Sequence, residues 1–229
     1  MTSARTTRGW ARQLGQLLAA VPLFLVAPLA RPWHIRWGAT DDEVTAPMPG
    51  DDLVPGCQYR ATRAITINAD RRYVWPWLVQ VGVGRAGFYS VDLLDNLARP
   101  SATEILPAHQ RPSVGAWIPM TATPTTTTAF TVHSFDPEQV LVWAKPDSTW
   151  VWRLTTNADG STRLVTRIRA CYHWSRPGSA ALSILLMEFG DFAMLRTMLH
   201  GVKIRPERLA AQALTSPTTP APDTRGWLR

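Results

Sequence analysis

The sequence is poor in the residues that build metal sites and disulfide frameworks. Its 229 residues include two cysteines, Cys57 and Cys171, and five histidines. Cys-x-x-Cys motifs and His/Cys clusters at ligand spacing are absent, so neither a zinc site nor any other metal or cofactor is predicted. The motifs Gly-x-Ser-x-Gly and His-Glu-x-x-His are absent too. The chain therefore lacks the signatures of the commonest serine hydrolases and zinc proteases.

Basic residues outnumber acidic ones, 24 to 17, but they do not form one stripe. Arg5, Arg8 and Arg12 lie at the start, whereas Arg163 and Arg167 alternate along a predicted strand. Nucleic-acid binding needs a basic patch with interleaved aromatic residues or a known module. Since neither is present, no nucleic-acid partner is predicted.

An uncharged apolar segment, residues 14–30, follows the first arginines. As a helix it would be about 26 Å long, slightly short of the roughly 30 Å hydrocarbon core of a bilayer. Trp10 and Trp33 flank it where interfacial aromatic residues would lie, whereas Pro22 and Pro28 would kink or end the helix.

Three interpretations of residues 1–35 remain open. The favoured one is a single membrane anchor with its basic end in the cytoplasm. The second is an apolar arm that lies on a bilayer or on the domain, and the third is a signal peptide, for which Pro28 leaves poor cleavage sites. We therefore expect a membrane-associated protein, and otherwise a cytoplasmic one.

The remaining chain divides by composition into three parts. Residues 36–58 are acidic and proline-rich, which predicts an extended connector. Residues 59–208 carry the periodic apolar patterns of a folded domain, and residues 209–229 predict a disordered tail because they offer little apolar surface to bury.

Periodicity predicts the elements of the domain. Alternation predicts a strand over 59–67, and helical spacing predicts helices over 70–81, capped by Asn68, and over 90–97, with Val91, Leu94 and Leu97 facing inward. Alternating, β-branched and aromatic-rich segments then predict strands over 116–120, 129–133, 139–144, 149–154 and 162–171. The threonine tract 123–128 is interpreted as a hairpin loop.

The last element is a long amphipathic helix from Ser179 to about Lys203. Its apolar face includes Leu182, Leu185, Phe189 and Phe192, which we expect to be buried. Strands followed by one long helix predict an α+β fold, in which a curved antiparallel sheet closes around the C-terminal helix. A cavity is expected between sheet and helix.

The glycines of residues 82–87 match Gly-x-Gly-x-x-Gly literally. A dinucleotide site needs a strand before this motif and a helix that opens within it. Here the preceding segment is a predicted helix, so the glycines are interpreted as a sharp loop.

Several motifs resemble those of bacterial SRPBCC proteins, the START-like and polyketide-cyclase-type superfamily. They are Arg36-Trp-Gly-Ala-Thr-Asp-Asp-Glu, Val74-Trp-Pro-Trp-Leu-Val-Gln80, Gly82-x-Gly-Arg-x-Gly, Tyr89-Ser-x-Asp92 and Met194-x-Arg196-x-Met198-Leu-x-Gly201-x-Lys203. The resemblance covers about residues 36–208. It implies a helix-grip fold with an apolar ligand cavity, and it is weak for activity because fold does not fix function.

The candidate cavity residues are polar groups and tryptophans within the predicted elements. They are Trp77, Gln80, Arg85, Tyr89, Trp117, His133, Trp143, Trp152, Glu188 and Asp191. Most have a structural alternative: His133 as a hydrogen-bonded strand residue, and Arg85 and Tyr89 as ties between loop and helix. The two carboxylates could instead reach solvent or pair with Arg196 or strand arginines. The tryptophans would line a pocket or fill a core.

The helix-grip resemblance also implies that the first strand lies antiparallel to the last. A register that pairs Ile67 with Ser161 would place Cys57 opposite Cys171, where a disulfide could form in an oxidising compartment.

Three functions therefore remain open. The favoured one is a carrier or sensor that binds a hydrophobic small molecule or lipid between sheet and helix. The others are a cyclase- or dehydratase-type enzyme acting on a polyketide-like substrate, and a structural or interaction domain without a ligand. Whether the protein is an enzyme stays open, with binding preferred.

Overall fold

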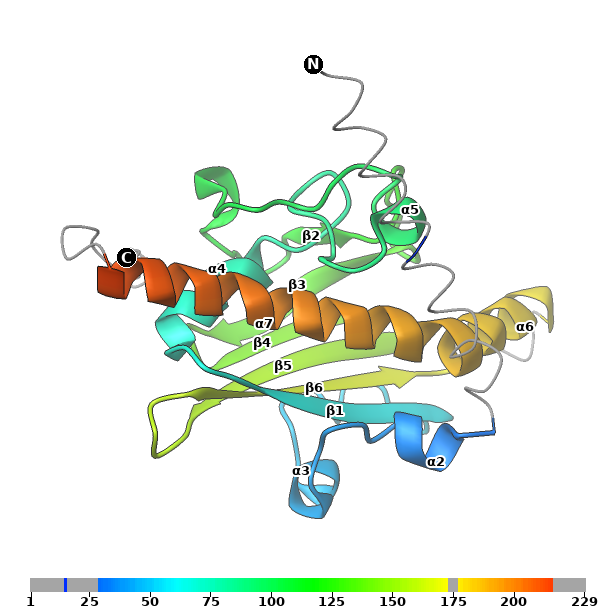
Figure 1. Ribbon diagram of the computed structural model, residues 1–229. Helices are drawn as coiled ribbons and strands as arrows, with labels where there is room; N and C mark the ends of the chain where they lie inside the picture. The colour runs from blue at the N-terminus through cyan, green and yellow to red at the C-terminus, as the bar shows by residue number, and fades with distance from the viewer. Residues whose placement is uncertain (1–14, 16–28, 173–176, 216–229) are drawn as a thin grey trace.

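The computed structural model describes residues 15, 29–172 and 177–215. It has the predicted α+β architecture, in which one six-stranded antiparallel sheet is crossed on one face by a long C-terminal helix (Figure 1). The strand order is β1-β6-β5-β4-β3-β2. The strands are β1 Tyr59–Ile67, β2 Trp117–Pro119, β3 Ala129–Asp136, β4 Val140–Lys145, β5 Ser148–Thr156 and β6 Thr162–Ala170.

The helices fall before, between and after the strands. They are α2 Arg31–His34, α3 Asp41–Thr45, α4 Arg71–Val79, α5 Asp92–Asp95, the 3-10 turn η1 Pro107–His109, α6 Pro177–Leu185, the π-helical turn η2 Leu186–Gly190 and α7 Asp191–Thr215. The arrangement is the helix-grip fold that the resemblance predicts.

The sheet has an inner face that contacts α7 and an outer face that does not. Along β1, alternate residues such as Tyr59, Ala61 and Ile67 pack into the core beneath the helix. Ala64 belongs instead to a smaller apolar cluster on the outer face. This alternation determines which predicted site residues can meet.

Residues 36–58 are part of the folded domain and not simply an extended connector. The segment contains α3, whose Thr40 and Glu43 form a reciprocal capping box. Glu43 also pairs with Arg163, and Asp51 pairs with Arg167, both on the outer face of β6. The alternating arginines of β6 therefore attach this segment to the sheet.

The first two predicted helices are shorter than expected. Asp70, not Asn68, caps α4 by accepting the Arg72 N–H at 2.9 Å. The second predicted helix, over 90–97, is reduced to the single turn α5. The residues on either side of α5 are not helical, so helical spacing does not determine which way they face. Val91 is buried as predicted, whereas Leu94 and Leu97 are about half exposed, at 48% and 50%.

The C-terminal helix is longer than predicted and changes its winding. It continues past Lys203 to Thr215, so the prediction of a disordered tail is wrong for 209–215, where Leu209 and Ala213 pack against the core. The π-helical turn inserts an extra residue and shifts the helical phase. Leu185 is therefore 54% exposed, contrary to prediction, whereas Phe192 is buried as predicted. The side chains of Leu182 and Phe189 lie outside the described residues.

The predicted cysteine register is wrong by one residue. Ile67 pairs with Thr162, not with Ser161. Cys57 and Cys171 are therefore not directly opposed, and both are free thiols.

Most of the predicted membrane segment, residues 16–28, lies outside the described part of the chain. Within the residues that are described, no helix is both long enough and apolar enough to cross a bilayer.

Candidate functional site

Three tryptophans cover the middle of the inner face, and we call Trp143, Trp150 and Trp152 the tryptophan wall. Trp143 on β4 pairs with Trp150 on β5, and Trp152 follows two residues later on the same face. Their rings pack on one another, with centroid distances of 5.3 Å for Trp143–Trp150 and 5.6 Å for Trp143–Trp152. The wall is thus a continuous aromatic surface beneath the helix.

The indole N–H groups of the wall are not equally satisfied. Trp150 Nε1 donates to Thr166 Oγ1 at 2.9 Å. Those of Trp143 and Trp152 are buried and have no hydrogen-bond acceptor among the described residues. A buried donor without a partner costs about 1–3 kcal/mol. The wall therefore presents two donors that an oxygen atom could satisfy.

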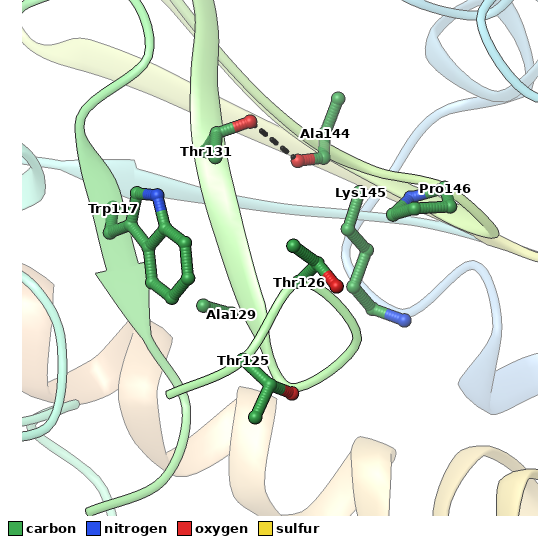
Figure 2. A pocket seen from close by; sticks show the side chains of 8 residues that line it. All are labelled: Trp117, Thr125, Thr126, Ala129, Thr131, Ala144, Lys145 and Pro146. Atoms are coloured by element: carbon green, nitrogen blue, oxygen red, sulfur yellow. Dashed lines mark hydrogen bonds between the residues drawn. The ribbon is translucent and has the colours of Figure 1, made fainter. Parts of the chain in front are cut away.

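A cavity was expected between the sheet and α7, but neither of two hollows in the described part of the chain lies there. One hollow of about 190 Å³ lies on the outer face and is lined by Trp117, Thr131, Ala144 and neighbouring loop residues (Figure 2). Another, of about 310 Å³, lies between α2, α3 and β1. The space under α7 contains large side chains instead, including the fully buried Trp143 and Trp152.

Two of the predicted cavity residues lie on the outer face, away from the wall. Trp117 pairs with Thr131, and its neighbour Ile118 points inward instead. Trp117 is accordingly 43% exposed. His133 is exposed beside a β-bulge between Val132 and Ser134. The structure therefore does not bring Trp117 or His133 to the inner face.

A buried polar cluster, formed by His34, Tyr59, Arg63 and Asp191, lies where α2, β1 and α7 meet. Arg63 Nη1 donates to Asp191 Oδ2 at 2.5 Å, and the Tyr59 hydroxyl donates to the same oxygen at 2.7 Å. Arg63 Nε donates to the His34 carbonyl at 2.7 Å. The Arg63 side chain is fully buried and that of Asp191 is 7% exposed. This is a desolvated ion pair with its hydrogen bonds largely satisfied.

Burial dominates the electrostatics of the polar cluster. Desolvation and the charge of Asp191 raise the pKa of Tyr59, which therefore stays a neutral donor. Desolvation, reinforced by the neighbouring Arg63 guanidinium, lowers the pKa of His34. At neutral pH the cluster holds one buried ion pair, one phenol and one neutral imidazole.

Glu188 lies beside the polar cluster on η2. It accepts from Arg31 Nε at 2.7 Å and from the Tyr172 hydroxyl at 3.3 Å. Desolvation and the carboxylate of Glu188 raise the pKa of Tyr172. Glu188 and Asp191, both predicted site residues, thus lie at the inner face, where Arg31 and Arg63 neutralise them.

Gln80, Arg85, Tyr89 and Trp77 form a separate group at the glycine loop. Gln80 is fully buried, and its amide donates to the Tyr89 hydroxyl at 2.9 Å, which in turn donates to the Trp77 carbonyl at 3.0 Å. Arg85 donates to the carbonyls of Trp117 and Val79. These contacts tie the loop to α4 and β2, which matches the structural alternative for Arg85 and Tyr89.

One further carboxyl group has a strongly shifted pKa. Burial, with the charge of Asp92, raises the pKa of Asp95 to about 7. Asp95 Oδ1 has no hydrogen-bond partner among the described residues. In the described part of the chain, His, Cys, Asp and Glu residues do not gather into a group of three that could hold a metal ion.

His34, Tyr59 and Arg63 are not among the site residues predicted from the sequence. A signal for Arg63 is present in the strand pattern, because Arg63 shares its phase with Tyr59, Ala61, Ile65 and Ile67. A charged residue in the apolar phase of a strand is either exposed or paired in the core. His34 had no comparable signal, since its burial depends on how α2 packs.

The chain is similar to several solved structures, but at low sequence identity. No protein-family model matches the chain, and the search of curated proteins found no match. The Polyketide_cyc-like protein Cgl2372 from Corynebacterium glutamicum aligns at 12% identity and TM-score 0.41, over 72% of this chain and 98% of that one.

Two further proteins align with lower TM-scores. CalU16 from Micromonospora echinospora aligns at 15% identity and TM-score 0.33, over 69% of this chain and 88% of that one. DynU16, a protein of the dynemicin biosynthetic locus, aligns at 16% identity and TM-score 0.34, over 65% of this chain and 49% of that one. The fold assignment rests on the strand order and helix placement described above, and these similarities assign no activity.

Proposed function

We propose that the protein binds a hydrophobic small molecule or lipid on the inner face of the sheet, against the tryptophan wall, as a carrier or sensor. The observation that supports this most is the wall itself, with the buried and unsatisfied indole N–H groups of Trp143 and Trp152. Flat aromatic surfaces bind flat or elongated apolar ligands, and a few polar groups orient them. An apolar ligand with an oxygen acceptor matches this surface.

The ligand would reach the wall beneath α6. Tyr59 of β1 bonds to Asp191 at the start of α7, so α6 and η2 lie near the end of the sheet where β5 begins. Trp150 is near that end and retains 6% exposure, whereas Trp143 and Trp152 retain none. In the described part, α6 contacts chiefly the adjoining η2 turn, and it extends beyond the sheet (Figure 1). Movement of α6 would uncover Trp150 first.

Native mass spectrometry of the purified full chain tests this function. We expect a bound mass of a small molecule that is lost in denaturing organic solvent. Trp152→Leu should lower the bound fraction several-fold, because it removes one wall ring, whereas Trp117→Leu on the outer face should leave it unchanged. Repeated absence of any bound mass, or equal loss in both variants, would contradict the proposal.

A further inference from the structure

His34 is fully buried in α2 and is held in its neutral form by its neighbours. Its Nδ1 lies 3.4 Å from Arg63 Nη2. A guanidinium only donates hydrogen bonds, so Nδ1 accepts and the ring proton is on Nε2. Nε2 is buried and has no hydrogen-bond partner among the described residues.

A second proton on this ring would have no favourable place. It would sit on Nδ1, directly facing the Arg63 guanidinium, while Nε2–H would remain buried without an acceptor. Asp191 and Glu188 also face the ring, from α7 and η2. Each carboxylate already accepts hydrogen bonds from other groups. Asp191 accepts from Arg63 and Tyr59, and Glu188 accepts from Arg31. Both carboxylates favour an imidazolium, but burial and the Arg63 guanidinium outweigh them, so the pKa of His34 is still lowered.

The attachment of α2 depends on a few contacts that surround His34. The Arg31–Glu188 ion pair holds the first residue of the helix to η2. The rings of Trp33 and His34 pack on Phe192 of α7, with centroids 5.2 and 5.3 Å away. Beyond the helix, the Ile35 carbonyl accepts the Thr62 N–H of β1 at 2.7 Å.

We infer that α2 is a pH-sensitive latch: protonation of His34 repels Arg63 and detaches α2 from β1 and α7. This regulatory device goes beyond the proposed function and does not depend on it.

The direction of the pH dependence follows from linkage. The docked state lowers the pKa of His34 below its ordinary 6.5, so the detached state binds the proton more readily. Docking is therefore at full strength above pH 6.5 and weakens as the pH falls from 6.5 towards the pKa of the docked state. Each pH unit within that window favours detachment about tenfold.

Hydrogen–deuterium exchange of the full chain tests the latch. Between pH 7.5 and pH 5.5, after correction for intrinsic exchange rates, the protection factors of the 33–38 amides and of Thr62 are expected to fall by up to about tenfold. His34→Gln, which stays neutral, should remove this fall. His133→Gln, on the exposed outer face, and His200→Gln, whose ring contacts Trp37 of the same segment, should retain it.

Two outcomes would overturn the inference. One is wild-type protection of 33–38 that does not change with pH, and the other is a His34→Gln variant that opens at low pH as the wild type does. Should His34→Gln already be open at pH 7.5, NMR titration of the wild-type His34 ring decides instead. A midpoint below 6.5 that coincides with the loss of protection supports the latch, and a midpoint at or above 6.5 contradicts it.

Discussion

Replacing Arg63 with leucine is expected to lower the free energy of unfolding by roughly 3–5 kcal/mol, because Asp191 would remain buried without its counter-charge. The Arg63 side chain is fully buried, and its guanidinium also satisfies the His34 carbonyl and the Tyr59 hydroxyl. Urea unfolding at pH 7 measures the change.

Two variants make the Arg63 result interpretable. The double variant Arg63→Leu/Asp191→Leu removes both charges and should recover a large part of the loss, since apolar replacement of a buried pair is often nearly neutral. Arg72→Leu breaks a half-exposed pair with Asp70 and should change stability by less than about 1 kcal/mol. A stability loss at Arg63 as small as that at Arg72 would show that water reaches Asp191.

Replacing Gly201 with alanine is the second substitution for which a large effect is expected. A Cβ at this position would lie 2.1 Å from the Tyr89 carbonyl oxygen and 2.7 Å from the Tyr89 Cβ. Because the contact is with backbone, α7 must move away from the glycine loop, at a cost of about 3 kcal/mol. Thermal unfolding should show a correspondingly lower Tm.

Gly178 supplies a matched control for Gly201, because it too is helical. A Cβ there would meet no atom within 4 Å among the described residues. Gly178→Ala should therefore be neutral or stabilising by up to about 1 kcal/mol, from helix propensity. Equal Tm changes in the two variants would contradict the close approach of α7 to Tyr89. The close approach of α7 to Tyr89 thus explains why the Met194–Lys203 motif has a glycine at position 201.

The strands were predictable from the sequence because the alternation of apolar and polar residues can be recognised within each short segment, without knowledge of its partners. β1 has the predicted bounds, Tyr59–Ile67. The prediction that Cys57 lies opposite Cys171 was wrong because it depended on the register between β1 and β6. A shift of one residue in that register changes which side chains oppose each other. The prediction that Leu185 is buried was wrong because the π-helical turn shifts the phase of the helix. The spacing of the apolar residues gives no sign of that turn.

The candidate site was predictable only in part. Glu188 and Asp191 were found because carboxylates on an apolar helical face are conspicuous, but their partners Arg31 and Arg63 depend on tertiary packing. The alternation of Phe130 and Val132 already assigns His133 to the outer face. Trp117 is harder, since β2 is too short for its phase to be read from alternation.

The central claim, that an apolar ligand binds against the tryptophan wall, is tested most directly by NMR of the indole N–H groups. The ¹⁵N-labelled full chain would be titrated with anilinonaphthalene sulfonate, a flat apolar probe. The resonances of Trp143, Trp150 and Trp152 are predicted to shift, while those of Trp33 and Trp117 stay in place. Shifts confined to Trp117, at the outer hollow, or no shift in any wall resonance, would contradict the claim.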